Sequence, residues 1–201
     1  MTKAMIWTLA ALAAALGGIA LTVREPPAPV LRAGVALETP TTLRHFELID
    51  QDGAPFTRAS LRGRWTLIVP GFTRCPDICP TTLATLNRVH QGLGDDAHRV
   101  GVVLLSLDPG RDTPEVLADY VGYFNPEFAA VTGAAEQLEA LYLDLGINHI
   151  RIPGAKGEYS VDHSTALLLI DPKGRLAGYV VPPINAGLLT ADLAQLLAPG
   201  D

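Results

Sequence analysis

The chain has 201 residues, of which 48% are hydrophobic, and a formal net charge of −6. This length fits one domain of ordinary size with an additional segment, and the acidic charge balance argues against a nucleic-acid partner. The two cysteines are too few to form the disulfide framework of such a domain, so they are either buried spectators or a functional pair.

Residues 4–23 form an apolar run without a charged side chain. A helix over this run would be about 30 Å long at about 1.5 Å per residue, which matches the core of a bilayer. We therefore predict a single transmembrane anchor over residues 1–24, with its amino terminus in the cytoplasm. The alternative is a cleaved signal peptide, although the small-residue site at residues 13–15 lies inside the apolar run.

Residues 25–40 are rich in proline and show little periodicity. Such a segment is typical of an extended spacer that holds a soluble domain away from the membrane. From residue 41 to residue 201 the composition is that of one compact domain, long enough to bury a sizeable core.

The hydrophobic pattern within residues 41–201 alternates between strands and helices. Thr113 and Pro114 indicate a helix start, and Gly146 indicates a helix end. In chain order we expect a β-hairpin over 44–63, a strand over 64–73, a helix over 81–94, a strand over 100–108, a helix over 112–124, a strand over 129–133, a helix over 134–146, a β-hairpin over 164–181 and a helix over 189–198.

This order of elements predicts an α/β fold with a mixed sheet flanked by helices. Functional groups in such folds gather at the carboxyl ends of parallel strands. Cys75 and Cys79 follow the predicted 64–73 strand and lie near the start of the next helix. The pair is therefore where a functional site is expected.

The spacing of Cys75 and Cys79 favours a metal over a disulfide. If the two residues span the first helical turn, their Cβ atoms lie about 5–6 Å apart, whereas a disulfide needs about 3.5–4.5 Å. The helix amino terminus and Arg74 should lower the pKa of both thiols, with Asp77 acting modestly against this. The alternative is that both cysteines are small core residues.

A third metal ligand should come from the histidines. His90 and His98 lie near the far end of the 81–94 helix, and His45 and His149 fall in expected surface strands or loops. His163 precedes an apolar strand, in a loop that could fold over the cysteines. It is either a ligand or a hydrogen-bonded surface histidine.

Two thiolates and one imidazole form a soft ligand set with low coordination number. Such a set suits Cu(I), with Cu(II) accessible if a fourth ligand arrives. Structural zinc usually takes four protein ligands, and the chain has no third cysteine.

Four segments of the sequence carry a resemblance to a known family. They are GFTRCPDICPTTL, LSLDPGRDTPEVLADYVGYFNPEF, VTGAAEQLEALYLDLGI and YSVDHSTALLLIDPKGRL, and they run in order over residues 71–176. Together they resemble the Sco/SenC proteins, which are copper-binding assembly factors for cytochrome c oxidase with a thioredoxin-like fold.

The resemblance has several implications. Cys75, Cys79 and His163 match the copper ligands of the family. A thioredoxin-like copper-binding domain over residues 41–201 is implied, facing the periplasm from a single-pass anchor in a bacterial inner membrane. The implied partners are the copper-bearing subunit of cytochrome c oxidase, and other copper chaperones or thiol reductants.

The sequence also departs from the family pattern. Family members commonly have an aromatic residue where this chain has Val69 or Pro70, and often a histidine in place of Arg74. Arg74 could tune the thiols or contact an acidic partner. The segment at residues 108–114 is either a partner-docking patch or a turn in which its aspartates accept backbone hydrogen bonds.

Three functions compete for the site. The first is a copper metallochaperone, and the second is a thiol-disulfide oxidoreductase that uses Cys75 and Cys79 as a redox pair to reduce the cysteines of the oxidase copper centre or another envelope protein. The third is a thiol peroxidase. Peroxidatic cysteines follow a threonine three residues earlier, and the corresponding residues here are Phe72 and Pro76, which argues against peroxidase activity.

Overall fold

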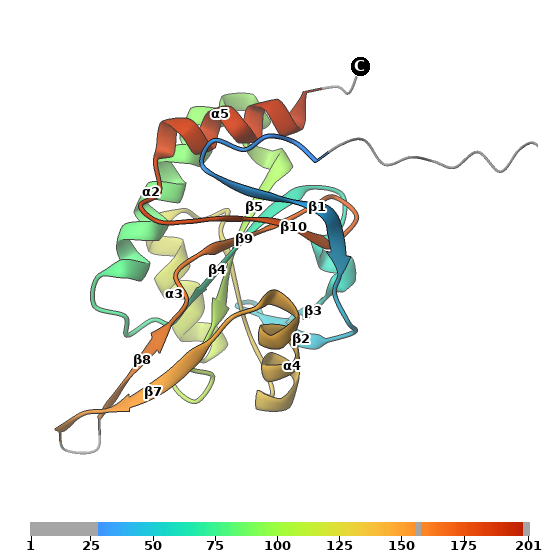
Figure 1. Cartoon of the computed structure of the whole chain (residues 1–201). Coiled ribbons are helices and arrows are strands. Elements are labelled where there is room, and N and C mark those ends of the chain that lie inside the picture. The colour runs from blue at the N-terminus through green and yellow to red at the C-terminus, as the bar shows by residue number, and fades with distance from the viewer. Residues whose placement is uncertain (1–27, 156–157, 199–201) are drawn as a thin grey trace, which may run out of the picture.

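An eight-stranded mixed sheet forms the centre of the protein in a computed structural model that describes residues 28–155 and 158–198 (Figure 1). The strand order in the sheet is β1-β10-β9-β4-β5-β6-β2-β3, and β7 and β8 form a separate two-stranded ribbon. The elements are β1 (Gly34–Thr42), β2 (Glu47–Asp50), β3 (Pro55–Thr57), the 3-10 helix η1 (Arg58–Leu61), β4 (Trp65–Gly71), α2 (Ile78–Leu93), the 3-10 helix η2 (Gly94–Arg99), β5 (Val100–Ser106), α3 (Pro114–Phe124), β6 (Ala129–Thr132), α4 (Ala135–Leu145), β7 (His149–Pro153), β8 (Tyr159–His163), β9 (Leu167–Ile170), β10 (Arg175–Val180) and α5 (Ala186–Leu197).

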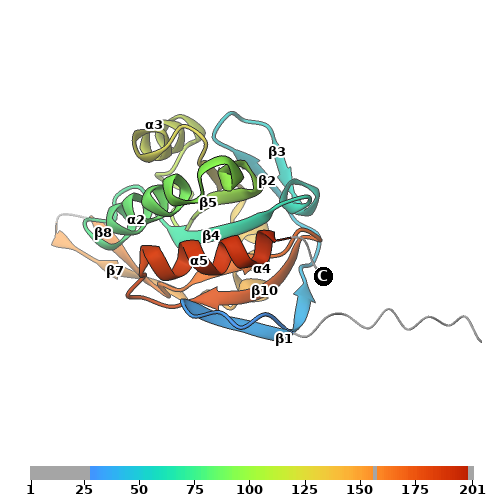
Figure 2. The same ribbon diagram turned by 90° about the horizontal axis from the view of Figure 1, so that it is seen from above.

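The parallel strands β4, β5 and β6 lie in the middle of the sheet and are covered on both faces. Successive residues of a strand point to opposite faces, so Leu67 packs with α2, α3 and α5, while Ile68 packs on the face that α4 covers. Figure 2 shows α2 and α5 side by side on one face of the sheet. The predicted mixed α/β sheet with helices on both faces is confirmed.

Several local predictions are also confirmed. The hairpins appear as β2–β3 and β9–β10. Thr113 accepts a hydrogen bond from the Val116 amide at the start of α3, with Pro114 at the first helical position. Gly146 ends α4 with φ +68°, a left-handed conformation that glycine adopts without steric cost.

Two strand pairs were not predicted. Strand β1 includes residues 34–40, where a spacer was expected, and pairs with β10 at the sheet edge. A proline is tolerated in an edge strand, and Pro40 hid the strand character of this segment in the sequence. The β7–β8 ribbon was missed because its outer face is exposed, at Ile150 and Ile152 among others, so neither strand shows a buried apolar run.

Helix α2 begins at Ile78, so only Cys79 is helical and the expectation that both cysteines share a first helical turn is wrong. Pro76 disfavours the helical conformation at Cys75, because its ring clashes with the preceding residue. Pro80 is tolerated in the first turn of α2, where its missing N–H would have no helical partner.

The predicted transmembrane helix over residues 4–23 lies outside the described residues. Within residues 28–155 and 158–198, no helix has the length and apolar character needed to cross a bilayer.

Candidate metal centre

The thiols lie at the carboxyl end of β4, as expected for this fold. The Leu107 amide donates to the Gly71 carbonyl at 2.8 Å, which joins the end of β4 to the residue after β5. The chain then turns, with the Cys75 amide donating to the Phe72 carbonyl at 3.2 Å, and enters α2. Cys75 is 8% exposed and Cys79 2% exposed. Both thiols are free and belong to the core, with Cys75 nearer to solvent.

Gly71 is a site residue that sequence reasoning missed. A Cβ atom at this position would lie 2.9 Å from the Cys79 sulfur and 3.0 Å from Leu104 Cδ1. Contacts this short force a displacement, so Cys79 can occupy its place only beside a glycine. The signal in the sequence was a glycine at the end of a buried strand, where backbone and side chain approach closely.

His163 ends β8 and faces the thiols. Its Nδ1–H group donates to the Ser164 carbonyl oxygen at 2.7 Å, because a carbonyl can only accept. This contact leaves Nε2 as the ring nitrogen that faces the sulfurs, 4.0 Å from the Cys79 sulfur. The Phe72 ring meets the imidazole edge to face, with ring centroids 6.1 Å apart. Backbone and ring together orient Nε2 toward the sulfurs.

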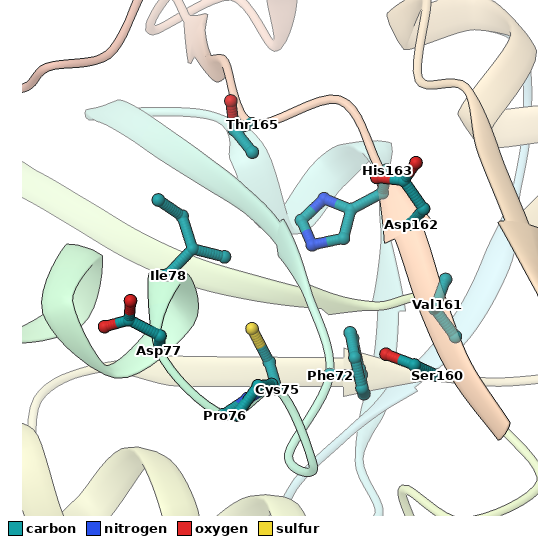
Figure 3. Close-up of a pocket in the computed structure, with 10 residues that line it drawn as sticks. All are labelled: Phe72, Cys75, Pro76, Asp77, Ile78, Ser160, Val161, Asp162, His163 and Thr165. Carbon is teal, nitrogen blue, oxygen red and sulfur yellow. The ribbon is translucent and has the colours of Figure 1, made fainter. Parts of the chain in front are cut away.

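Within the described part of the chain, Cys75, Cys79 and His163 form the one group of three or more potential metal-ligating side chains. Their ligand atoms all lie within 4.8 Å of one another. Figure 3 shows the Cys75 sulfur and the His163 ring pointing into one cleft. The cleft has a volume of about 240 Å³, and β8 forms its opposite wall. The structure thus brings together the three predicted site residues.

The pKa values of the two thiols are shifted in opposite directions. A hydrogen bond from the Cys79 thiol holds the pKa of Cys75 far below its ordinary value, and contacts with His163 and backbone N–H groups act in the same direction. The same thiol–thiol hydrogen bond, together with burial, raises the pKa of Cys79. Sequence reasoning expected both values to fall, which is wrong for Cys79, because one proton shared by two sulfurs favours the thiolate on one of them only.

His163 and Arg74 differ in how they interact with the two thiols. Burial by itself would lower the pKa of His163, but hydrogen bonds with Cys75 and with the Ser164 carbonyl raise it overall. The Arg74 side chain is largely exposed and lies 3.8 Å from the Glu158 carboxylate. Arg74 is not among the largest causes of the lowered Cys75 pKa, for which it was predicted to matter.

The other four histidines have partners elsewhere. His45 lies near Glu47, His98 near the Asp95 carbonyl, and His149 near Glu139. His90 is buried at the far end of α2, edge to face with Phe128. None of them belongs to the cluster with the thiols.

The donor atoms are compatible with a single soft metal ion. Two sulfurs that bind one ion at about 2.3 Å each can be up to about 4.6 Å apart, close to the 4.8 Å limit of the cluster. The set is already partly deprotonated at Cys75, and its imidazole presents a defined nitrogen. Two sulfurs and one nitrogen match the preference of copper for soft ligands.

Comparisons with known proteins agree with this site. The SCO1/SenC family model matches residues 35–198. A Stutzerimonas stutzeri protein named for copper binding is 40% identical over 153 residues, which are 76% of this chain and 75% of the relative. ScoI of Bradyrhizobium japonicum, solved with copper bound, aligns with a TM-score of 0.73 and 32% identity over 78% of this chain and 100% of that chain. The apo Sco1 protein of Thermus thermophilus aligns with a TM-score of 0.75 and 32% identity, over 84% and 98% of the two chains.

Proposed function

Because the chain belongs to the SCO1/SenC family, we propose that it is a copper metallochaperone that binds one copper ion through Cys75, Cys79 and His163. The observation that carries the proposal is the convergence of these three donor atoms within 4.8 Å. The proposed recipient is the dinuclear copper centre of cytochrome c oxidase.

Copper is cargo in this proposal, and the residues of the chain prepare the ligands for it. The Cys79 thiol stabilises the Cys75 thiolate, so one ligand is available without the loss of a further proton. The Ser164 carbonyl fixes the His163 tautomer, which keeps Nε2 free to bind metal. Gly71 lets the Cys79 sulfur lie against β4.

Delivery requires that a partner can reach the ion. Cys75 and His163 border the cleft, whereas Cys79 is almost fully buried. Ligands of the recipient subunit would therefore replace Cys75 and His163 before Cys79. We propose the copper-bearing subunit of cytochrome c oxidase as recipient, with other copper chaperones or thiol reductants acting upstream.

The proposed location is the periplasmic side of a bacterial inner membrane. The support is the uncharged apolar run over residues 4–23, long enough to span a bilayer. A single anchor there, followed by a proline-rich spacer that starts at residue 25, would hold the copper domain near a membrane-embedded oxidase.

The second candidate function is reduction of disulfides in the oxidase copper centre or another envelope protein. The opposite pKa shifts of the two thiols favour it, since a low-pKa, less buried Cys75 could attack a disulfide and Cys79 could then resolve the mixed disulfide. Both activities can belong to one protein.

The His163→Ala variant of the full chain in detergent discriminates between these functions. Loss of a ligand should weaken Cu(I) binding more than about a hundredfold, because loss of a residue that only hydrogen-bonds a ligand already lowers metal affinity about 10–100-fold. Dithiol exchange with a model disulfide should stay largely intact. His98→Ala is the matched control and should leave both unchanged, because His98 lies in η2, outside the cluster and outside the β7–β8 ribbon. If oxidase assembly in cells survives His163→Ala, the metallochaperone function is wrong.

A further inference from the structure

The loop over residues 107–113, between β5 and α3, contains a fully buried acid that holds the His163 strand. Asp108 is 0% exposed and accepts hydrogen bonds from Arg111 Nε and, at 2.5 Å, from the Tyr159 hydroxyl. A buried carboxylate needs such partners, because its desolvation is otherwise uncompensated. Tyr159 is the first residue of β8, the strand that ends at His163.

Arg111 adds two further contacts to Tyr159. Its Nη1 group donates to the Tyr159 carbonyl at 3.1 Å, and its guanidinium carbon lies 3.7 Å from the centre of the Tyr159 ring. One planar side chain thus binds the Asp108 carboxylate, the backbone of β8 and an aromatic face, a combination that lysine cannot reproduce. Its side chain is only 14% exposed.

The same loop also holds the cysteine side of the site. Asp112, likewise 0% exposed, accepts from the Thr73 hydroxyl at 2.6 Å and the Thr73 amide at 3.2 Å through one oxygen. Its other oxygen accepts from the Ser106 hydroxyl at 2.6 Å. Thr73 lies two residues before Cys75, so Asp112 ties the thiol turn to the end of β5.

The β7–β8 ribbon has few other means of fixing its position. It is a sheet of two strands that extends from the body of the protein (Figure 1). Two-stranded ribbons are marginally stable by themselves. Elsewhere the described part of the ribbon contacts the body through the buried Val161, through His149 with Tyr142 and Glu139, and through His163 with Phe72. At the start of β8, the attachment consists mainly of the contacts of Tyr159.

We propose that Arg111, with Asp108 and Tyr159, is a positioning residue for His163. Arg111 fixes the start of β8 and thereby sets the distance from the imidazole to the thiols. Asp112, in the same loop, holds the turn that carries the thiols. This inference rests on the proposed copper site and assigns the 107–113 loop an intramolecular function in place of partner docking or a simple capped turn.

The contacts of Arg111 predict how much each substitution should weaken Cu(I) binding. Without the Arg111 contacts, β8 samples positions in which His163 is away from the sulfurs, and the apparent copper affinity falls by the fraction of molecules that stay competent. We expect roughly tenfold weaker Cu(I) binding for Arg111→Lys and a smaller loss for Tyr159→Phe, which keeps the ring. Arg111→Ala is avoided, since it leaves Asp108 buried without its cation.

Arg175→Lys is the matched control. Arg175 forms an equivalent short-range pair with a buried acid, Asp171, at 2.7 Å, and its side chain is 20% exposed. It lies in the β9–β10 hairpin, on strand β10, which does not contribute to the cleft. Arg175→Lys should lower the melting temperature by a similar amount to Arg111→Lys, while its copper affinity stays that of the wild type.

The decisive experiment is a double-mutant cycle for Cu(I) affinity with Arg111→Lys and His163→Ala in the full chain, together with hydrogen–deuterium exchange of the copper-free proteins. If Arg111 acts through His163, the Arg111→Lys loss disappears in the His163→Ala background, and amides of residues 159–163 exchange several-fold faster in Arg111→Lys but not in Arg175→Lys.

An equal loss of affinity in both backgrounds, or unchanged exchange of residues 159–163, overturns the positioning role while leaving the copper function intact. If even the wild-type chain fails to bind copper, the proposed function fails, and the exchange data still decide whether Arg111 fixes β8.

Discussion

The two halves of the candidate site are held in place by different kinds of structure. Cys79 lies on α2, packed against the central strand β4, in the continuous core of the domain. His163 lies at the end of a two-stranded ribbon whose outer face is exposed. The thiols are therefore positioned mainly by burial of apolar side chains, and the imidazole mainly by polar contacts beside the buried Val161.

This difference suits the proposed metallochaperone function, in which a metal ion is both bound and released. Core packing resists small displacements, so the thiols keep their relative position. A ribbon fixed by hydrogen bonds from one loop can shift at lower cost, because local opening needs few contacts to break. We infer that the histidine side is the adjustable part of the site.

Truncation of an apolar side chain in each region should give the largest contrast. Leu83→Ala, at a fully buried position of α2, should lower the free energy of unfolding by about 2–5 kcal/mol. Ile152→Ala, on the 44% exposed side chain of β7, should cost less than about 0.5 kcal/mol. Urea unfolding followed by circular dichroism measures both, and similar losses would remove the distinction between the two regions.

Gly71→Ala tests how tightly the thiol side is packed. The new methyl group would contact the Cys79 sulfur and Leu104, and overpacking of this kind costs about 1–3 kcal/mol. The displaced sulfur should also weaken copper binding, measured by competition with a Cu(I) chelator.

Gly122→Ala provides the control for this substitution, since nothing lies within 4 Å of its Cβ position on the exposed face of α3. It should stabilise the fold by about 0.5–1 kcal/mol, because alanine favours helix over glycine. Wild-type stability and copper binding in Gly71→Ala would show that the close approach is not required.

The pH dependence of thiol alkylation should differ between the wild type and Cys79→Ala without a change in fold. Only the thiolate reacts, so the rate falls as pH drops through the thiol pKa. The lowered pKa of Cys75 predicts reaction with iodoacetamide at pH values well below about 8.5, the ordinary cysteine value. In Cys79→Ala the largest cause of the lowering is gone, and the midpoint should move upward. Mass spectrometry of the reduced, copper-free chain identifies the alkylated residue; an ordinary midpoint for wild-type Cys75 contradicts the shared-proton arrangement.

Sequence patterns predicted the central part of the fold well and its margins poorly. Buried strands such as β4 and β5 are continuous apolar runs, and the signals at Thr113 and Gly146 mark helix ends through local chemistry. Strand β1 lacks such a run and pairs with β10, which is far away in the sequence, and the β7–β8 ribbon lacks one because its outer face is exposed.

The site was predictable by residue type and resemblance, but its supporting contacts were not. Local spacing suggested a metal for Cys75 and Cys79, while His163 needed the resemblance to distinguish it from the other histidines. The Gly71 approach to Cys79 and the Arg111 contacts with Tyr159 arise from tertiary packing. Both depend on how the chain folds back on itself, which the chemistry of the single residues does not reveal.

X-ray absorption spectroscopy of the copper-loaded full chain tests the central claim most directly. We predict one copper per chain with two sulfur ligands and a histidine nitrogen, and loss of that nitrogen in His163→Ala while both sulfurs remain. A copper site without sulfur, or an unchanged nitrogen contribution in His163→Ala, would contradict the assignment of Cys75, Cys79 and His163 as the ligands.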